Sequence, residues 1–327
     1  MTTNITIIGL GQIGASIGLA FADKQTDVRR VGHDKNPETA KLAQKQGAVD
    51  DIEYNLPASV KDAAVVILCL PLDQIRPTLE IIAQDLKEGA VVIDVSPAKR
   101  SLANWVKDIL PADRYYVGIT PALNPAYLHE FESGIDAAHA DLFNGATLLL
   151  DTPLHLPEQA VNIASNLTQA LGAKTMFSDS AEADGMMASV HLLPQLAAAA
   201  LLNSTLEQPG WQETRKIASK PYALATAALA DADALREAVL SNKENALRVL
   251  DGFIASLTDL RDAIADDNDA DSLGKRLKSA HTGRQNWWDG RSSNAWKDSS
   301  DIKVEMPSFG AQIKQTFLGE RKKPTRE

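Results

Sequence analysis

The chain has 327 residues, 44% of them hydrophobic and 23% charged, with a net charge of −10. Its length exceeds the usual size of one domain, so we expect two domains in an ordinary globular protein. The negative charge argues against nucleic acid or a membrane surface as partner, because both attract clustered Lys and Arg. The single cysteine, Cys69, cannot form an internal disulfide, and the sequence has no Cys-rich motif, so we expect no metal site.

The N-terminal segment lacks the features of a secretory signal peptide. A strand-like pattern begins by the sixth residue, with no basic region before it and no cleavage site. No apolar run approaches the roughly 18 residues needed to span a bilayer. We therefore expect a cytoplasmic protein with no membrane association.

Short apolar runs alternate with helical patterns through residues 1–152. Most of these runs are continuously apolar, which is typical of parallel strands covered by helices on both faces. The alternation predicts right-handed βαβ units and an α/β domain with an open parallel sheet. The expected strands are Ile5–Ile8, Val28–Gly32, Val65–Leu70, Val91–Val95, Tyr115–Ile119 and Ala146–Leu150, and the expected helices include Ile13–Ala22, Pro37–Gln46 and Gln74–Asp85.

The pattern changes after Thr152. Pro157–Leu171 predicts a helix, AKTMF a short strand, and residues 180–280 are almost entirely helix-forming. Two segments, ASVHLLPQLAAAALLNSTL and ENALRVLDGFIASLTDLRDAI, carry apolar faces broad enough to require burial on several sides. We therefore expect residues 153–288 to form an all-α domain that makes a homodimer; a self-contained core is the alternative. Residues 289–327 predict a polar linker and a tail, in which VEMPSFGAQIKQTFLG is a candidate docked helix.

A glycine-rich loop joins the first expected strand to the first expected helix. Gly9, Gly11 and Gly14 form a G-x-G-x-x-G arrangement directly after an apolar strand and before an amphipathic helix. Gly9 permits the tight turn, Gly11 lets the backbone approach a pyrophosphate, and Gly14 brings helix and strand together. Free N–H groups at the helix N-terminus attract the diphosphate. The loop predicts a Rossmann-type domain that binds a nicotinamide dinucleotide, with a ligand-free tight turn as the alternative.

The residue that ends the second strand favours NAD over NADP. Asp34 follows Gly14 by about 20 residues, where a carboxylate bonds the adenosine ribose hydroxyls and repels a 2′-phosphate. Three nearby cations, Arg29, Arg30 and Lys35, would accommodate that phosphate and keep NADP as the alternative. The expected cofactor-binding residues are Gly9, Gly11, Gln12, Ile13, Gly14, Asp34, Leu70 and Pro71.

Seven segments lie in a characteristic order: GLGQIGASIGLA, VVIDVSPAKRSL, YVGITPALNP, ESGIDAAHADLFNGATLLLDTP, ADGMMASVHLLPQL, GWQETRKIASKP and SNKENALRVLDGF. In sequence and spacing, as far as about Arg284, they resemble the prephenate/arogenate dehydrogenase family. The resemblance implies a Rossmann domain followed by a helical dimerisation domain. It also implies oxidative decarboxylation of a cyclohexadienol in tyrosine biosynthesis, with hydride passing to the nicotinamide.

The resemblance points to candidate catalytic residues in the first half. Family members carry a histidine, in a His-Pro-Met-Ala-Gly run, that accepts a hydrogen bond from the substrate hydroxyl and assists its deprotonation. The matching position here is Thr120, whose hydroxyl can position a substrate but is no base near pH 7. The family's serine in an Asp-Val-Gly-Ser-Val-Lys run is replaced by Pro97, and Ser96 is the candidate substitute.

The same comparison covers the helical half. The family's His-Asp pair matches Ala183-Asp184, and its Ser-His-Leu-Pro-His run matches residues 191–195, which leaves His191 as the histidine nearby. In GWQETRKIASKP, Arg215 matches an arginine that pairs with a substrate carboxylate, a task suited to a guanidinium fork. Lys216 is the alternative if the register shifts by one residue. The expected catalytic residues are therefore Thr120, Ser96, His191 and Arg215.

Three functions fit these observations. The leading one is an NAD-dependent dehydrogenase of the prephenate/arogenate type. The second is a dehydrogenase with the same cofactor and dimer but another small carboxylate substrate. The third is a catalytically silent NAD-binding protein. The residues leave all three open, because the cofactor loop is intact while the positions that carry the chemistry are altered.

Overall fold

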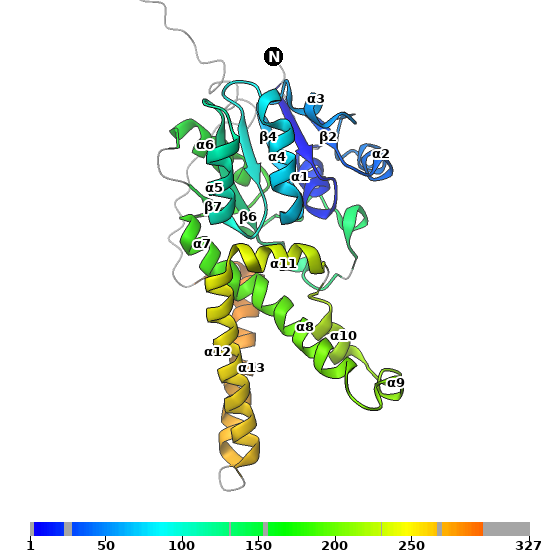
Figure 1. The fold of residues 1–327 in the computed structure, drawn as a ribbon, viewed down its shortest axis with the longest axis vertical. Helices are drawn as coiled ribbons and strands as arrows, with labels where there is room; N and C mark the ends of the chain where they lie inside the picture. The colour runs from blue at the N-terminus through cyan, green and yellow to red at the C-terminus, as the bar shows by residue number, and fades with distance from the viewer. Residues whose placement is uncertain are drawn as a thin grey trace, which may run out of the picture. The chain divides into compact units, whose positions relative to one another are not determined.

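The computed structural model describes residues 3–22, 28–130, 132–152, 156–229, 231–266 and 270–296. The chain divides into two compact units, with the boundary between Ala183 and Asp184. The first unit contains a sheet covered by helices, and the second consists of helices (Figure 1). This two-part α/β and all-α organisation is the one that the sequence predicts.

One eight-stranded sheet forms the frame of the first unit, in the order β3-β2-β1-β4-β5-β6-β7-β8. Neighbouring strands are parallel except β6 and β7, which are antiparallel. The strand order reverses between β1 and β4, the position at which doubly wound sheets bind ligands. The strands are β1 (Thr3–Ile8), β2 (Val28–His33), β3 (Asp51–Ile52), β4 (Val65–Leu68), β5 (Val91–Asp94), β6 (Tyr115–Pro121), β7 (Thr147–Asp151) and β8 (Lys174–Ser178).

Helices cover both faces of this sheet. Apolar side chains of α1 (Gln12–Ala22), α2 (Pro37–Lys45) and α6 (Glu158–Ala170) form one core with alternate residues of the central strands. On the opposite face α3 (Leu56–Val60), α4 (Leu72–Ile82) and α5 (Lys99–Ile109) pack in succession. The short helical turns are η1 (Ala83–Asp85), η2 (Pro125–Tyr127) and η3 (Gly134–Ala137).

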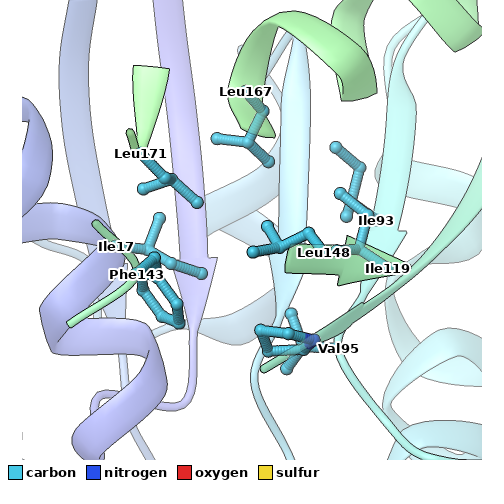
Figure 2. Close-up of a pocket in the computed structure, with 9 residues that line it drawn as sticks. Ile17, Ile93, Val95, Ile119, Phe143, Leu148, Leu167 and Leu171 are labelled. Carbon is cyan, nitrogen blue, oxygen red and sulfur yellow. The ribbon is translucent and has the colours of Figure 1, made fainter. Parts of the chain in front are cut away.

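A small cavity of about 10 Å³ lies in the core between the sheet, α1 and α6 (Figure 2). An apolar cavity of this size offers water no hydrogen-bond partner, so we interpret it as a packing gap and not as a ligand site. Its lining residues are all apolar, namely Ile17, Ile93, Val95, Ile119, Pro121, Phe143, Leu148, Leu167 and Leu171.

The sequence predicts a domain boundary at residue 152, whereas the structure divides the chain after Ala183. After β6 the chain reverses direction into β7, continues through α6 and adds β8 to the same sheet. Ile163 and Leu167 of α6 are buried in the core of the first unit. The first unit therefore extends through this additional β–α–β segment, to Ala183.

The second unit consists of helices, and α7 leads into it from the first unit. Two long helices, α12 and α13, pack side by side (Figure 1). Because α13 continues to Ser293, the expected linker is wrong for residues 289–293; from Lys297 the expected linker and tail lie outside the described residues. The helices are α7 (Ser180–Met187), the π-helical turn η4 (Ala188–Leu192), α8 (Leu193–Leu206), α9 (Trp211–Thr214), α10 (Lys220–Thr226), α11 (Ala232–Ser241), α12 (Lys243–Ala265) and α13 (Ala270–Ser293).

One helical stretch differs from the expectation that no apolar segment is long enough to span a membrane. Among the described residues, the continuous helical stretch Ser180–Leu206 is long and apolar enough to cross a bilayer by length and composition alone. Such a helix is also typical of subunit interfaces, because both environments require an apolar surface. Length and composition therefore do not assign it to a membrane.

The position of the boundary can be tested with two fragments. A fragment of residues 1–183 is expected to unfold in one cooperative thermal transition. A fragment of residues 1–152 lacks α6 and β8, so it leaves the core side of β7 uncovered, and we expect it to aggregate or melt without cooperativity. Circular dichroism during heating measures both. A cooperative transition in the shorter fragment would contradict the boundary at Ala183.

Candidate active site

The glycine loop has the geometry that a dinucleotide requires. Gly9 adopts φ = +91°, and a Cβ there would lie 2.3 Å from the carbonyl oxygen of Cys69. A Cβ on Gly14 would lie 1.9 Å from the carbonyl oxygen of Gly9, so α1 can pack here only without a side chain. Beside Gly11, in contrast, a Cβ would meet no described atom within 4 Å. The loop therefore combines two sterically required glycines with one that leaves space for a pyrophosphate.

The carboxylate of Asp34 is fixed beside this loop. Its Oδ2 accepts a hydrogen bond from the backbone N–H of Leu10 at 2.8 Å. Its Oδ1 accepts one from the backbone N–H of Asn36, also at 2.8 Å. Each carboxylate oxygen has a further lone pair, so both can also accept a bond from a ribose hydroxyl. Asp34 thus connects the end of β2 to the glycine loop and presents a negative charge there.

Two of the three nearby cations are engaged elsewhere. The Arg29 Nε lies 2.7 Å from Asp51, whose hydrogen bond raises the pKa of Arg29. Arg30 is buried and forms three hydrogen bonds with Asp50, together with two to backbone carbonyls. Burial alone would raise the pKa of Asp50, but the bonds from Arg30 outweigh it and lower that pKa. Both arginines therefore stabilise the fold, which leaves Lys35 as the candidate cation for a 2′-phosphate.

The other expected cofactor residues gather at the same edge of the sheet. Gln12 and Ile13 are the first two residues of α1. Leu70 and Pro71 lie between β4 and α4, and a Cβ on Gly9 would be 3.0 Å from the Leu70 side chain. The carboxyl ends of β1, β2 and β4 thus bring together all eight residues; their contact with a cofactor stays a prediction.

A polar cluster lies at the carboxyl ends of β5 and β6. Because strand side chains alternate between faces, Asp94 and Ser96 share a face with Tyr116 and Thr120. All four residues are buried. The cluster lies on the face covered by α5, opposite the apolar core that contains the cavity.

Lys99 is the centre of this cluster, and it is fully buried together with Asp94. Its Nζ lies 3.0 Å from each oxygen of Asp94 and donates to the carbonyl of Ile119 at 2.9 Å. Tyr116 donates to Asp94 Oδ2 at 2.6 Å. Lys99 therefore ties the end of β5 to the residue immediately before Thr120.

The same network fixes the two predicted hydroxyl residues. The Ser96 hydroxyl donates to Asp94 Oδ1 at 2.5 Å, and the Ser96 backbone N–H donates to the same oxygen at 2.8 Å. Thr120 Oγ1 donates to the carbonyl of Ser96 at 3.0 Å. The structure thus brings Ser96 and Thr120 together. Sequence reasoning missed Lys99, although an Asp that ends an apolar strand, followed by a Lys, is a signal of a buried pair.

The two remaining candidates lie in the second unit. His191 belongs to the π-helical turn η4, and its carbonyl accepts a hydrogen bond from Gln195 Nε2 at 2.9 Å. Its side chain keeps exposed surface, yet desolvation by neighbouring atoms lowers the pKa of His191 and favours the neutral ring. Arg215 is exposed at the end of α9, and the alternative residue Lys216 pairs with Glu213 at 2.7 Å.

Metal chemistry has no obvious location in this part of the chain. Among the described residues, no group of three or more His, Cys, Asp or Glu side chains is arranged to hold a metal ion. The candidate site is therefore a dinucleotide cradle with a neighbouring cluster of hydroxyl, carboxylate and ammonium groups. That combination is suited to binding and orienting a hydroxylated substrate beside a redox cofactor.

Two family models match adjacent parts of the chain. The nucleotide-binding domain of prephenate dehydrogenase matches residues 17–177, and the dimerization domain of prephenate dehydrogenase matches residues 179–279. The chain belongs to the prephenate dehydrogenase family. The predicted resemblance is thereby confirmed, and the first unit is the nucleotide-binding domain of a family of NAD-dependent oxidoreductases. The junction of the two matches agrees with a unit boundary after β8, not with one at residue 152.

Individual relatives extend over most of the chain. It is 27% identical to the prephenate dehydrogenase of Bacillus subtilis (strain 168), over 96% of this chain and 84% of that protein. It is also 27% identical to the cyclohexadienyl dehydrogenase of Zymomonas mobilis, over 86% of this chain and 94% of that protein. The prephenate dehydrogenase of A. aeolicus, solved with hydroxyphenyl propionate and NAD+, shares the fold: TM-score 0.76, 23% identity, covering 88% of this chain and 98% of that one.

The buried Lys99–Asp94 pair leads to a stability prediction. Lys99→Met leaves the Asp94 carboxylate buried without its cation, so we expect the free energy of unfolding to fall by about 3–5 kcal/mol. Urea denaturation measures it. Lys41→Met is the control, because Lys41 pairs with Glu38 at the surface, where solvent screens the pair, so its loss is expected to change the stability far less. Equal losses for the two variants would contradict the role given to Lys99.

Proposed function

We propose that this chain is an NAD-dependent dehydrogenase that oxidises and decarboxylates a cyclohexadienol carboxylate of the prephenate or arogenate type. The observation that carries the proposal is the intact glycine cradle with Asp34 at its edge, in a chain that matches both domains of the family. Named relatives include prephenate and cyclohexadienyl dehydrogenases. The cytoplasmic location expected from the sequence stays a prediction.

The residues of the first unit would hold the cofactor and orient the substrate hydroxyl. When bound, the nicotinamide would accept a hydride from the carbon that carries the substrate hydroxyl, while that hydroxyl loses its proton and the carboxylate on the opposite ring carbon leaves as carbon dioxide. Gly9, Gly11 and Gly14 would cradle the diphosphate, and Asp34 would bond the adenosine ribose. The remaining task for side chains of this chain is to orient the reacting hydroxyl and to accept its proton.

Thr120 is suited to orienting that hydroxyl but not to taking its proton. Its own proton is directed to the Ser96 carbonyl, so its oxygen lone pairs remain available to accept a hydrogen bond. Asp94 is an unfavourable alternative base, because protonating it would leave Lys99 charged and buried beside a neutral partner. In the second unit, Arg215 is proposed to bind a substrate carboxylate and His191 to contact the substrate as a neutral ring.

One observation favours a second candidate. The family histidine position is Thr120, and a hydroxyl there is compatible with a pocket reshaped for another small carboxylate substrate. The same cofactor and the same subunit arrangement would serve that reaction. The substitution at this one position therefore separates the two candidates experimentally.

Restoring the histidine tests which candidate holds. If prephenate or arogenate is the substrate, the wild type is expected to be slow and Thr120→His to raise kcat. A positioned base contributes about 10²- to 10⁴-fold, and the gain is smaller while Pro97 remains. The assay follows NADH formation with each substrate.

Two results would change the conclusion. Thr120→His that harms a reaction with another carboxylate would support the second candidate. Fast wild-type turnover of prephenate, unaffected by Thr120→Ala, would contradict the role of Thr120.

Arg215→Ala is expected to raise KM and leave kcat nearly unchanged, because it would remove binding of a carboxylate distant from the hydride.

We infer that the second unit forms a homodimer. It matches the family's dimerization domain, and most of its most apolar helical window is not buried within one chain. On α12, exposed apolar residues recur at helical spacing and form one stripe. These residues, which we call the α12 stripe, are Leu247, Ile254, Leu257 and Ile264.

Light scattering tests the dimer. The wild type is expected at twice the mass of one chain, and the double variant Ile254→Glu/Leu257→Glu at the mass of one chain, because charges would be buried in the α12 stripe. Ser256→Glu, on the opposite side of α12, is the matched control and should remain dimeric. A monomeric wild type would contradict the inference.

A further inference from the structure

The Lys35 side chain spans the carboxyl end of β1. Lys35 follows Asp34 at the end of β2, and its Nζ donates to Gln74 Oε1 at 3.2 Å. Gln74 is the third residue of α4, which follows β4. Because β2 and β4 pair with opposite edges of β1, this contact passes across the strand end from which the glycine loop begins.

Lys35 differs from Arg29 and Arg30 in the kind of group that its charge contacts. Arg29 and Arg30 are paired with carboxylates of the fold, on Asp51 and Asp50. Lys35 is exposed and, within the described residues, forms no ion pair; its ammonium contacts the neutral amide of Gln74. An exposed hydrogen bond of this kind is weak, so the ammonium is readily released to a better acceptor.

The negative charge beside it cannot move away in the same manner. Asp34 is held by the N–H groups of Leu10 and Asn36, on two different loops. Lysine is a compact charge on a flexible stem, and phosphate is among the anions it binds. A fixed anion and a mobile cation therefore occupy adjacent positions in the sequence, at the end of the site where the adenosine ribose is expected.

We propose that Lys35 is a specificity-determining residue of the dinucleotide site, which favours a 2′-phosphate and so opposes Asp34. The inference rests on the dinucleotide site proposed above. Asp34 makes NAD the preferred cofactor, while Lys35 limits how strongly NADP is rejected. Gln74 competes with the 2′-phosphate for the same ammonium and thereby favours NAD.

Calorimetric titration of the full chain with NAD and with NADP tests this directly. Lys35→Met is expected to weaken NADP binding about tenfold, the effect of one lost phosphate ion pair, and to change NAD affinity less than about twofold. Lys35→Arg keeps the charge and should retain NADP binding. Gln74→Leu frees the ammonium and should strengthen NADP binding by about two- to threefold. Added salt should weaken NADP more than NAD, and less so in Lys35→Met.

Lys41→Met is the matched control, because it removes the same charge from the adjacent helix α2 at a lysine paired with Glu38. It should leave both affinities within about twofold of wild type. If Lys35→Met weakens both cofactors equally, or neither, or if Lys41→Met has the same effect, the inference is overturned while the NAD site stands. A wild type that binds neither dinucleotide would overturn the proposed function, and this inference with it.

Discussion

The close approach of α1 to the end of β1 is the constraint on which the rest of the candidate site depends. It requires the absence of a side chain at Gly14, where a Cβ would lie 1.9 Å from the Gly9 carbonyl oxygen. That approach aims the N-terminus of α1 over the strand end, where its free N–H groups can meet a diphosphate. The bond from Leu10 N–H to Asp34 then fixes β2 to the same loop. The glycine loop and Asp34 therefore form one rigid unit.

A second constraint acts at the opposite side of the switch point. Lys99, Asp94 and the carbonyl of Ile119 tie β5 to β6 within the hydrophobic surroundings of α5. Charges buried in this way are costly unless each finds several partners, and here both do. The result is a fixed geometry, because the backbone before Thr120 has little freedom to shift. The two constraints define the two ends of a site that extends over β1, β4, β5 and β6.

The sequence predicted those parts of the fold that local patterns determine. The glycine loop, Asp34 and the first strands depend on residues close together in the chain, and each lies where it was expected. The reversal at β7 was missed because TLLLD is as continuously apolar as a parallel strand, so its direction is not encoded in its pattern. β3 has two residues and leaves no periodicity to detect. The network around Lys99 joins residues from three elements, and only its Asp94–Lys99 part leaves a local signal; the contacts with Tyr116 and Ile119 depend on tertiary structure.

The substitution of the family histidine by Thr120 lies within an intact fold. Thr120 is buried, bonded to the Ser96 carbonyl and preceded by a residue anchored to Lys99. Because Thr120 is held firmly, the absence of a histidine at this position changes the chemistry of the site and not the local fold. A hydroxyl in a fixed position still contributes orientation, while the driving force of aromatisation is a property of the substrate. Under the proposed function, the fold would thus retain the part of catalysis that depends on position, and the substitution at residue 120 would isolate the part that depends on proton transfer.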